Sequence, residues 1–208
     1  MIKLIDTLRK NFLKKKLKDK NYLFLFDPPP KNEYVAFDTE TTGLNPKKDE
    51  ILSIGAVKIK DNRILLNERF YVIVKPDKPI SEESIKIHGL RKKDIENGIQ
   101  VKEAIEKFLH FVGSRPLVGY YVDFDVEMVS KYTKEFIGIP LVNEKIDVSG
   151  LYYDYKVGKI PQGFVDLRFD TIIKDLNIPS FGKHDALNDA IMTALIFLKL
   201  KNLLNSRY

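Results

Sequence analysis

Two carboxylic acids, Asp38 and Glu40, lie one residue apart where an apolar segment ends. Residues 34–37 read Tyr-Val-Ala-Phe and are followed by the stretch DTETTGL. If a β-strand continues through residue 40, its alternation points both carboxylates to the same face of the sheet. Neighbouring carboxylates repel each other unless a positive charge lies between them. A divalent cation such as Mg²⁺ or Mn²⁺, which prefers carboxylate oxygens, is one solution, and solvated side chains at a strand end are the other.

Two later stretches place further ionisable groups at the beginnings of expected helices. Asp125 follows Phe124 and is expected in the first turn of the helix that comes after the apolar segment 117–121. The stretch HDALNDA opens the closing helix and contains His184 and Asp189. Their spacing of five residues corresponds to about 140° around a helix. We therefore expect Asp189 to be fixed on the helix and His184 to lie on the loop before it.

The rest of the sequence supplies the elements that would position these groups. Alternating or apolar segments predict strands at 34–38, 51–60, 64–74, 117–121 and 145–148. Helical periodicity predicts helices at 101–112, 123–136, 167–176 and 186–204. Three successive strands followed by strands that alternate with helices predict an α/β domain with a mixed sheet.

The N-terminal segment differs from the rest of the chain in its charge. Residues 1–20 contain eight Lys or Arg against two Asp, which accounts for the whole formal net charge of +6. Apolar residues at helical spacing predict a basic amphipathic helix over 2–18, and Pro28-Pro29-Pro30 marks a linker. We therefore divide the chain into an N-terminal helix and linker, 1–33, and a main domain, 34–208. A basic segment is either a solvated face or a contact for a polyanion.

Composition excludes several classes of protein. The chain has no cysteine, which excludes disulfides, thiolate metal sites and a cysteine nucleophile. Its apolar content of 44% and charged content of 31% are typical of globular proteins. No apolar run is long enough for a membrane span, and the N-terminal region is too rich in lysine for a secretory signal. We expect a cytoplasmic protein with no membrane partner.

Taken together, the three motifs resemble those of the DEDDh family of 3′→5′ exonucleases, also called DnaQ-like. Within it the chain is most similar to the proofreading epsilon subunits of bacterial DNA polymerase III. The resemblance covers about residues 34–200 and includes the segment Ile87-His88-Gly89-Leu90. It implies an RNase H-like fold with a five-stranded mixed sheet flanked by helices, so that residues 34–208 would be an exonuclease domain. Tyrosine in place of His184 would have indicated the sister DEDDy subclass.

The resemblance also implies a mechanism. Asp38, Glu40, Asp125 and Asp189 would hold two Mg²⁺ or Mn²⁺ ions, which stabilise the attacking and leaving oxygens at phosphorus. His184 would be the general base that takes a proton from the attacking water. The enzyme would release nucleoside 5′-monophosphates from DNA 3′ ends in proofreading or repair.

Substrate contacts implied by the resemblance come from several segments. They are Thr41, Gly43, Leu44, His88, Tyr120, Tyr121 and Phe124. Leu44 would wedge against the terminal base, although a leucine can equally be core and Gly43 a turn residue. Tyr120-Tyr121 replace the His-Asn pair with which the second motif usually begins, so the substrate contacts differ from the family pattern.

Two other functions remain open at this point. An RNA-directed DEDDh exonuclease would use the same chemistry on another polymer. A catalytically silent module that binds nucleic acid or a polymerase would be expected to lack at least one of the five catalytic residues, and all five are present. The expected partners are a single-stranded or frayed DNA 3′ end and a DNA polymerase subunit, and the sequence predicts no oligomeric state.

Overall fold

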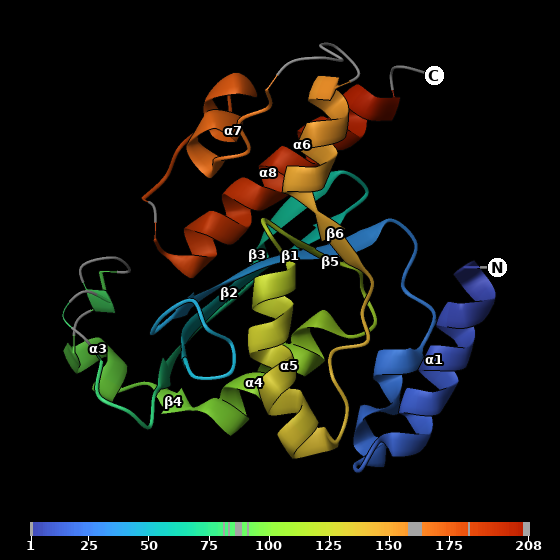
Figure 1. The fold of residues 1–208 in the computed structure, drawn as a ribbon, viewed down its shortest axis with the longest axis vertical. Helices are drawn as coiled ribbons and strands as arrows, with labels where there is room; N and C mark the ends of the chain where they lie inside the picture. The colour runs from blue at the N-terminus through green and yellow to red at the C-terminus, as the bar shows by residue number, and fades with distance from the viewer. Residues whose placement is uncertain are drawn as a thin grey trace.

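The computed structural model describes residues 2–80, 82, 84–85, 89–90, 92–157, 164–182 and 184–205. Within these residues the strands form one mixed sheet of six strands in the order β4-β3-β2-β1-β5-β6. Helices cover both of its faces (Figure 1). The strands are β1 (Glu33–Thr41), β2 (Ile51–Lys60), β3 (Arg63–Lys75), β4 (Ile99–Gln100), β5 (Leu117–Gly119) and β6 (Lys145–Asp147).

The first three strands form an antiparallel meander, as the sequence predicts. β1 pairs with β2 and β2 with β3, and both pairings are antiparallel. The chain turns between β2 and β3 at Asp61 and Asn62, which have φ angles of 47° and 63°. Positive φ at both central residues is the requirement of the tightest hairpin turns, which explains the Asp-Asn pair. β5 and β6 then add to the sheet in parallel on the other side of β1.

Two helical layers enclose the sheet, and both layers contribute to the site. The helices are α1 (Ile2–Lys16), the 3-10 helix η1 (Lys20–Phe26), α3 (Lys92–Glu96), α4 (Val101–Val112), α5 (Asp123–Ile137), α6 (Val148–Val157), α7 (Phe169–Asp175) and α8 (Ala186–Asn205). In Figure 1, α1, α4 and α5 lie below the sheet and α6, α7 and α8 above it. No helix in the described ranges has both the length and the apolar character needed to span a bilayer.

The central strand β1 is buried on both faces and alternates between the two layers. Val35 and Phe37 belong to the core cluster that includes α4 and α5, whereas Ala36 belongs to the cluster that includes α6, α7 and α8. Period-2 alternation continues this pattern along the strand. Thr39 therefore faces α5. Asp38 and Glu40 share the even positions with Ala36 and therefore face α8.

One expectation about the elements was wrong, and one helix was missed. The sheet has six strands and not five, because Ile99 and Gln100 pair in parallel with the last two residues of β3. A strand of two residues is too short to show alternation in the sequence. The helix α6 was not predicted, because Gly150 and three tyrosines give this segment low helix propensity. Burial of Val148 and Tyr152 against the α8 layer stabilises it instead.

The N-terminal segment packs against the same core as the sheet. Leu17, Tyr22 and Leu25 are buried in the cluster that contains Phe37. The backbone N–H of Lys18 donates to the carbonyl oxygen of Ile137 at 2.9 Å, which joins the end of α1 to the end of α5.

Candidate active site

An acidic cluster forms where β1 ends beneath the first turn of α8. One carboxylate oxygen from each of Asp38, Glu40 and Asp189 lies within 4.8 Å of the others. Asp38 and Glu40 face α8 because both lie at even positions of β1. Because Asp38 and Glu40 point to the same face, as predicted, a third carboxylate from α8 can lie beside both.

A glycine on the neighbouring strand lets α8 come this close. Gly55 of β2 pairs with Asp38 across the sheet. A Cβ atom at Gly55 would lie 2.2 Å from the carbonyl carbon of Ala186, the first residue of α8. Because no side chain fits there, the first turn of α8 rests directly on the sheet backbone, and Asp189 lies in that turn.

Asp125 approaches the site from the other face of the sheet. It is buried in the first turn of α5. Both the backbone N–H and the hydroxyl of Thr39 donate to its Oδ1, at 3.0 and 2.6 Å. Asp125 lines the same cavity as the acidic cluster but is not one of its three members. Thr39 and Asp38 are neighbours on β1 and point to opposite faces of the sheet, so Asp125 beside Thr39 lies apart from the three clustered carboxylates.

Burial and mutual repulsion raise the pKa values of these carboxyl groups. Burial, followed by the charges of Asp125 and Glu40, raises the pKa of Asp38 well above its ordinary value. Burial and then Asp189 raise the pKa of Glu40 to about 7. Burial also raises the pKa of Asp125 to about 7, against the lowering effect of the Thr39 hydrogen bonds. No Lys or Arg is among the described residues that line the cavity. Hard carboxylate oxygens without a cationic side chain are suited to a divalent cation.

His184 lies on the loop before α8, as predicted, and its side chain is exposed. Its φ of 58° is in the left-handed region, and its backbone N–H donates to Oδ2 of Asp189 at 3.1 Å. Asp185 accepts the backbone N–H of Asn188 at 2.9 Å and so caps the first turn of α8. The helix start therefore fixes the loop that carries the imidazole.

A cavity of about 520 Å³ brings most of the predicted site residues together. It is lined by Asp38, Thr39, Glu40, Leu44, Tyr120, Tyr121, Phe124, Asp125, Phe169, His184 and Asp189. All five residues predicted to be catalytic are in this set. Of the predicted substrate contacts, Thr41 and Gly43 do not line the cavity, and His88 lies outside the described residues.

The loop after β1 presents Leu44 to solvent at the edge of the cavity. Leu44 is 87% exposed, so it is not a core residue. The Thr41 hydroxyl donates to the carbonyl oxygen of Gly43 at 2.8 Å. The Asp49 carboxylate accepts the backbone N–H of Asn45 at 2.8 Å, and a Cβ at Gly43 would lie 2.7 Å from it. Thr41 and Gly43 thus shape the loop that carries Leu44.

The two tyrosines differ in how they are held. The Tyr120 hydroxyl donates to the carbonyl oxygen of Leu167 at 2.9 Å, and its ring centroid is 4.9 Å from that of Phe169. Tyr121 is 50% exposed, has a φ of 49°, and its backbone N–H donates to Oδ1 of Asp147 at 3.2 Å. Tyr120 is therefore anchored in the wall of the cavity, whereas the ring of Tyr121 stands at its mouth.

Thr39 and Phe169 line the cavity but were not among the predicted site residues. Thr39 lies between Asp38 and Glu40 in the sequence. The alternation of β1, which turns Thr39 towards the opposite helical layer, was the pattern that could have indicated its position. Phe169 begins α7 and reaches Tyr120 only through the tertiary fold. No spacing along the sequence connects these two aromatic residues.

Comparison with known proteins agrees with this site. Residues 35–197 match a protein family described as Exonuclease. The chain belongs to this exonuclease family. A DNA polymerase III of the PolC type from Thermotoga petrophila is 32% identical over 166 residues, which are 80% of this chain and 12% of that protein. The chain thus spans only a small part of the length of that relative.

Two further similarities concern a protein of comparable length and a solved structure. The DNA polymerase III subunit epsilon of Aquifex aeolicus is 29% identical over 167 residues, which cover 80% of this chain and 79% of that protein. The crystal structure of E. coli exonuclease I in complex with a dT13 oligonucleotide has a TM-score of 0.70 and 17% identity, and the match covers 85% of this chain and 42% of that chain. At this identity the structural match shows the exonuclease fold, which is the expected RNase H-like fold.

Proposed function

We propose that this member of the exonuclease family is a metal-dependent 3′→5′ exonuclease that releases nucleoside 5′-monophosphates from DNA 3′ ends. The observation that carries the proposal is the cluster of Asp38, Glu40 and Asp189 with the exposed imidazole of His184 on the same cavity. The similarity to a polymerase III epsilon subunit supports DNA as the polymer and a polymerase subunit as a partner.

The carboxylates are proposed to hold two divalent cations, Mg²⁺ or Mn²⁺. Asp38, Glu40 and Asp189 would hold them through hard oxygen ligands, and Asp125, which lines the same cavity, would be the fourth ligand. Two bound ions supply positive charge to the attacking and leaving oxygens of an in-line displacement at phosphorus. The hydrogen bonds from Thr39 keep the Asp125 carboxylate oriented towards the strand end.

His184 is the proposed general base. Its imidazole is exposed on the cavity, where it can take a proton from a water molecule that attacks the terminal phosphodiester. The backbone hydrogen bond between His184 and Asp189 holds this loop beside the acidic cluster. Removal of a positioned base typically costs about 10² to 10⁴ in rate, so His184→Ala should lower kcat by a factor in this range.

The apolar residues of the cavity are suited to a single-stranded end. Leu44 projects into solvent from the loop after β1, and Tyr121, which lines the same cavity, is half exposed. Bases of an unpaired strand gain from stacking on aromatic side chains. The Tyr120 hydroxyl already donates to a protein carbonyl, so we assign the stacking contact to Tyr121 and a supporting role to Tyr120.

The proposal is tested with 5′-labelled single-stranded DNA and RNA oligonucleotides of the same sequence, incubated with Mg²⁺, Mn²⁺ or EDTA. We compare the wild type with the double variant Asp38→Asn/Glu40→Gln. A matched control, Glu135→Gln/Asp154→Asn, removes two exposed carboxylates outside the cavity. The proposal expects metal-dependent shortening of DNA by the wild type and the control but not by the site variant. Faster shortening of RNA would indicate the RNA-directed function, and no shortening of either polymer would indicate a binding module.

A further inference from the structure

The surface formed by α1 and the start of η1, hereafter the α1 surface, carries cationic side chains that have no role in the proposed site. Five exposed cations form no ion pair within the described part of the chain: Arg9, Lys14, Lys15, Lys16 and Lys20. Residues 21–208 have equal numbers of basic and acidic side chains, so the net charge of +6 comes from the first twenty residues. The α1 surface is therefore a concentrated positive patch on an otherwise neutral molecule.

The same surface exposes apolar side chains between its cations. Leu8 and Phe12, one helical turn apart, are 61% and 56% exposed. The Lys16 ammonium lies 4.5 Å from the centroid of the Phe12 ring. Cationic side chains interleaved with an exposed aromatic ring are typical of surfaces that bind single-stranded nucleic acid.

The α1 surface is held at a fixed place relative to the catalytic cavity. Leu17, directly after α1, is buried, and Lys18 binds the end of α5 through its backbone N–H and its Nζ. A Cβ at Gly138, just after α5, would lie 3.0 Å from the carbonyl oxygen of Lys16. Asp125 lies at the other end of α5, whose 15 residues span about 22 Å. The two sites are therefore separated by about the length of α5.

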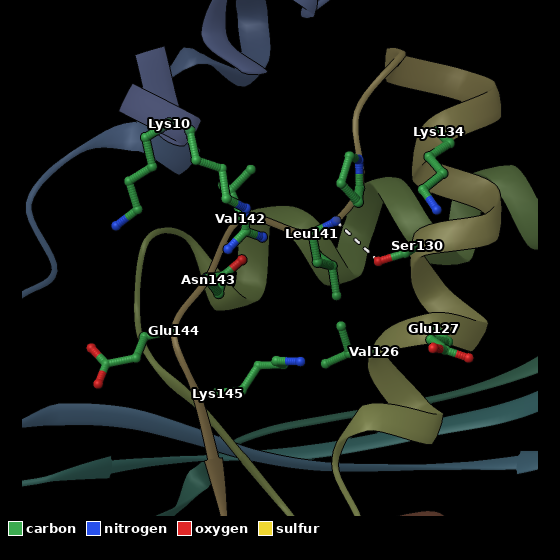
Figure 2. Close-up of a pocket in the computed structure, with 12 residues that line it drawn as sticks. Lys10, Val126, Glu127, Ser130, Lys134, Leu141, Val142, Asn143, Glu144 and Lys145 are labelled. Atoms are coloured by element: carbon green, nitrogen blue, oxygen red, sulfur yellow. Dashed lines mark hydrogen bonds between the residues drawn. The ribbon is translucent and has the colours of Figure 1, made fainter. Parts of the chain in front are cut away.

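A groove borders the α1 surface and shares Arg9 with it. A cavity of about 400 Å³ lies between α1 and α5 and is lined by Arg9, Lys10, Val126, Glu127, Ser130, Lys134, Pro140, Leu141, Val142, Asn143, Glu144 and Lys145. Figure 2 shows Lys10 on one side, Lys134 on the α5 side and Lys145 towards the sheet. The lining contains four basic and two acidic side chains, and Lys145 also pairs with Asp123.

The groove and the catalytic cavity have lining residues about one helical turn apart on α5. Phe124 lines the catalytic cavity, and Glu127, three residues later, lines the groove. Residues three apart are neighbours on a helix surface. A strand whose 3′ end lies in the catalytic cavity can therefore continue along the groove to the α1 surface.

We propose that the groove and the α1 surface form a second nucleic-acid site, which binds the phosphate backbone of the strand on the 5′ side of the reacting end. This inference rests on the proposed function, because the catalytic cavity sets the direction of the strand. Lysine contacts to phosphates release condensed counterions, so the site adds affinity that depends on salt. A lipid surface would also attract a basic amphipathic helix, but the groove beside α1, which lies within one helical turn of the catalytic cavity along α5, favours a strand.

The test uses the triple variant Lys14→Gln/Lys15→Gln/Lys16→Gln of the full chain. Binding of a fluorescent single-stranded 20-mer is measured in EDTA as a function of salt, and KM and kcat are measured with Mg²⁺ for the 20-mer and a trinucleotide. The stacked length of a trinucleotide is about 7 Å, at about 3.4 Å for each step, which is too short to reach the three substituted lysines beside the far end of α5. Each lost phosphate contact lowers the slope of log Kd against log salt by about 0.7, so the loss of three contacts should lower this slope by about 2. KM should rise for the 20-mer alone, with kcat unchanged.

The control variant Arg63→Gln/Lys102→Gln/Lys174→Gln removes three exposed cations from β3, α4 and α7. Equal weakening by both triple variants would overturn the proposal, since it would report net charge alone. An unchanged salt slope, or an equal rise of KM for the trinucleotide, would also overturn it. If the Lys14→Gln/Lys15→Gln/Lys16→Gln variant still binds the strand but no longer sediments with phosphatidylserine vesicles, α1 is assigned to a membrane surface instead. Binding in EDTA is measured without turnover, so failure of the proposed nuclease function is seen separately.

Discussion

Replacement of Glu40 by glutamine should stabilise the metal-free protein at neutral and higher pH, although this side chain belongs to the proposed catalytic cluster. Burial and the nearby Asp189 raise the pKa of Glu40 from 4.5 to about 7. The folded protein therefore holds a proton on Glu40 at pH values where the unfolded chain has lost it. The free energy of unfolding should decrease as pH rises from about 4.5 to 7.

The size of this effect follows from the pKa difference. At about 1.36 kcal/mol for each pH unit, a change from 4.5 to about 7 corresponds to about 3 kcal/mol once Glu40 is ionised. Glutamine has nearly the same shape and no charge, so Glu40→Gln removes this cost. The contributions of Asp38 and Asp125 are not additive with it, because these groups titrate together.

The assay is urea unfolding in EDTA at pH 4.5 and pH 8. Glu40→Gln should exceed the wild type by about 3 kcal/mol in free energy of unfolding at pH 8 and by little at pH 4.5. The control Glu135→Gln, an exposed residue on α5, should stay within about 0.5 kcal/mol of the wild type at both values. Added Mg²⁺ should stabilise the wild type more than Glu40→Gln. A variant that is less stable than the wild type at pH 8 in EDTA would refute the reasoning.

Three further substitutions test the geometry of the site. Gly55→Ala introduces a Cβ 2.2 Å from the α8 backbone, so it should lower the free energy of unfolding by about 1 to 3 kcal/mol and reduce the stabilisation by Mg²⁺, both measured by urea unfolding. Thr39→Val removes the 2.6 Å hydrogen bond to Asp125, so it should cost about 2 kcal/mol at pH 8 in the same assay. Tyr121→Ala should raise KM for single-stranded DNA about 10-fold through lost stacking, whereas Tyr120→Phe should change it little, as steady-state kinetics will report.

Each of these expectations has a result that would contradict it. Full Mg²⁺ stabilisation in Gly55→Ala would mean that the first turn of α8 need not rest on the sheet. Unchanged stability in Thr39→Val would mean that the backbone N–H alone holds Asp125. A larger KM change in Tyr120→Phe than in Tyr121→Ala would exchange the roles assigned to the two tyrosines.

The sequence predicted those features that depend on local periodicity. Alternation along β1 placed Asp38 and Glu40 on one face, and the helical spacing of HDALNDA placed His184 before α8 and Asp189 within it. The meander and the mixed sheet follow from the order of alternating and helical segments. These patterns are local because neighbouring residues in one element share a face through its geometry alone.

Features that depend on long-range contact were not predictable in the same way. The hydrogen bonds between Thr39 and Asp125 join residues 86 positions apart, and the fit of α8 over Gly55 is visible only in the folded chain. The two-residue strand β4 is formed by pairing with β3 and has no pattern of its own. Tertiary burial likewise overrides the low helix propensity of α6.

A time course with a single-stranded DNA 20-mer, labelled at its 5′ end in one sample and at its 3′ nucleotide in another, tests the central claim most directly. With Mg²⁺ or Mn²⁺, the 5′ label should move through products that shorten by one nucleotide at a time, while the 3′ label is released first as a nucleoside 5′-monophosphate. EDTA should abolish both changes. Intact DNA under every metal condition, or early release of the 5′ label, would contradict the assignment of this site as a metal-dependent 3′→5′ exonuclease.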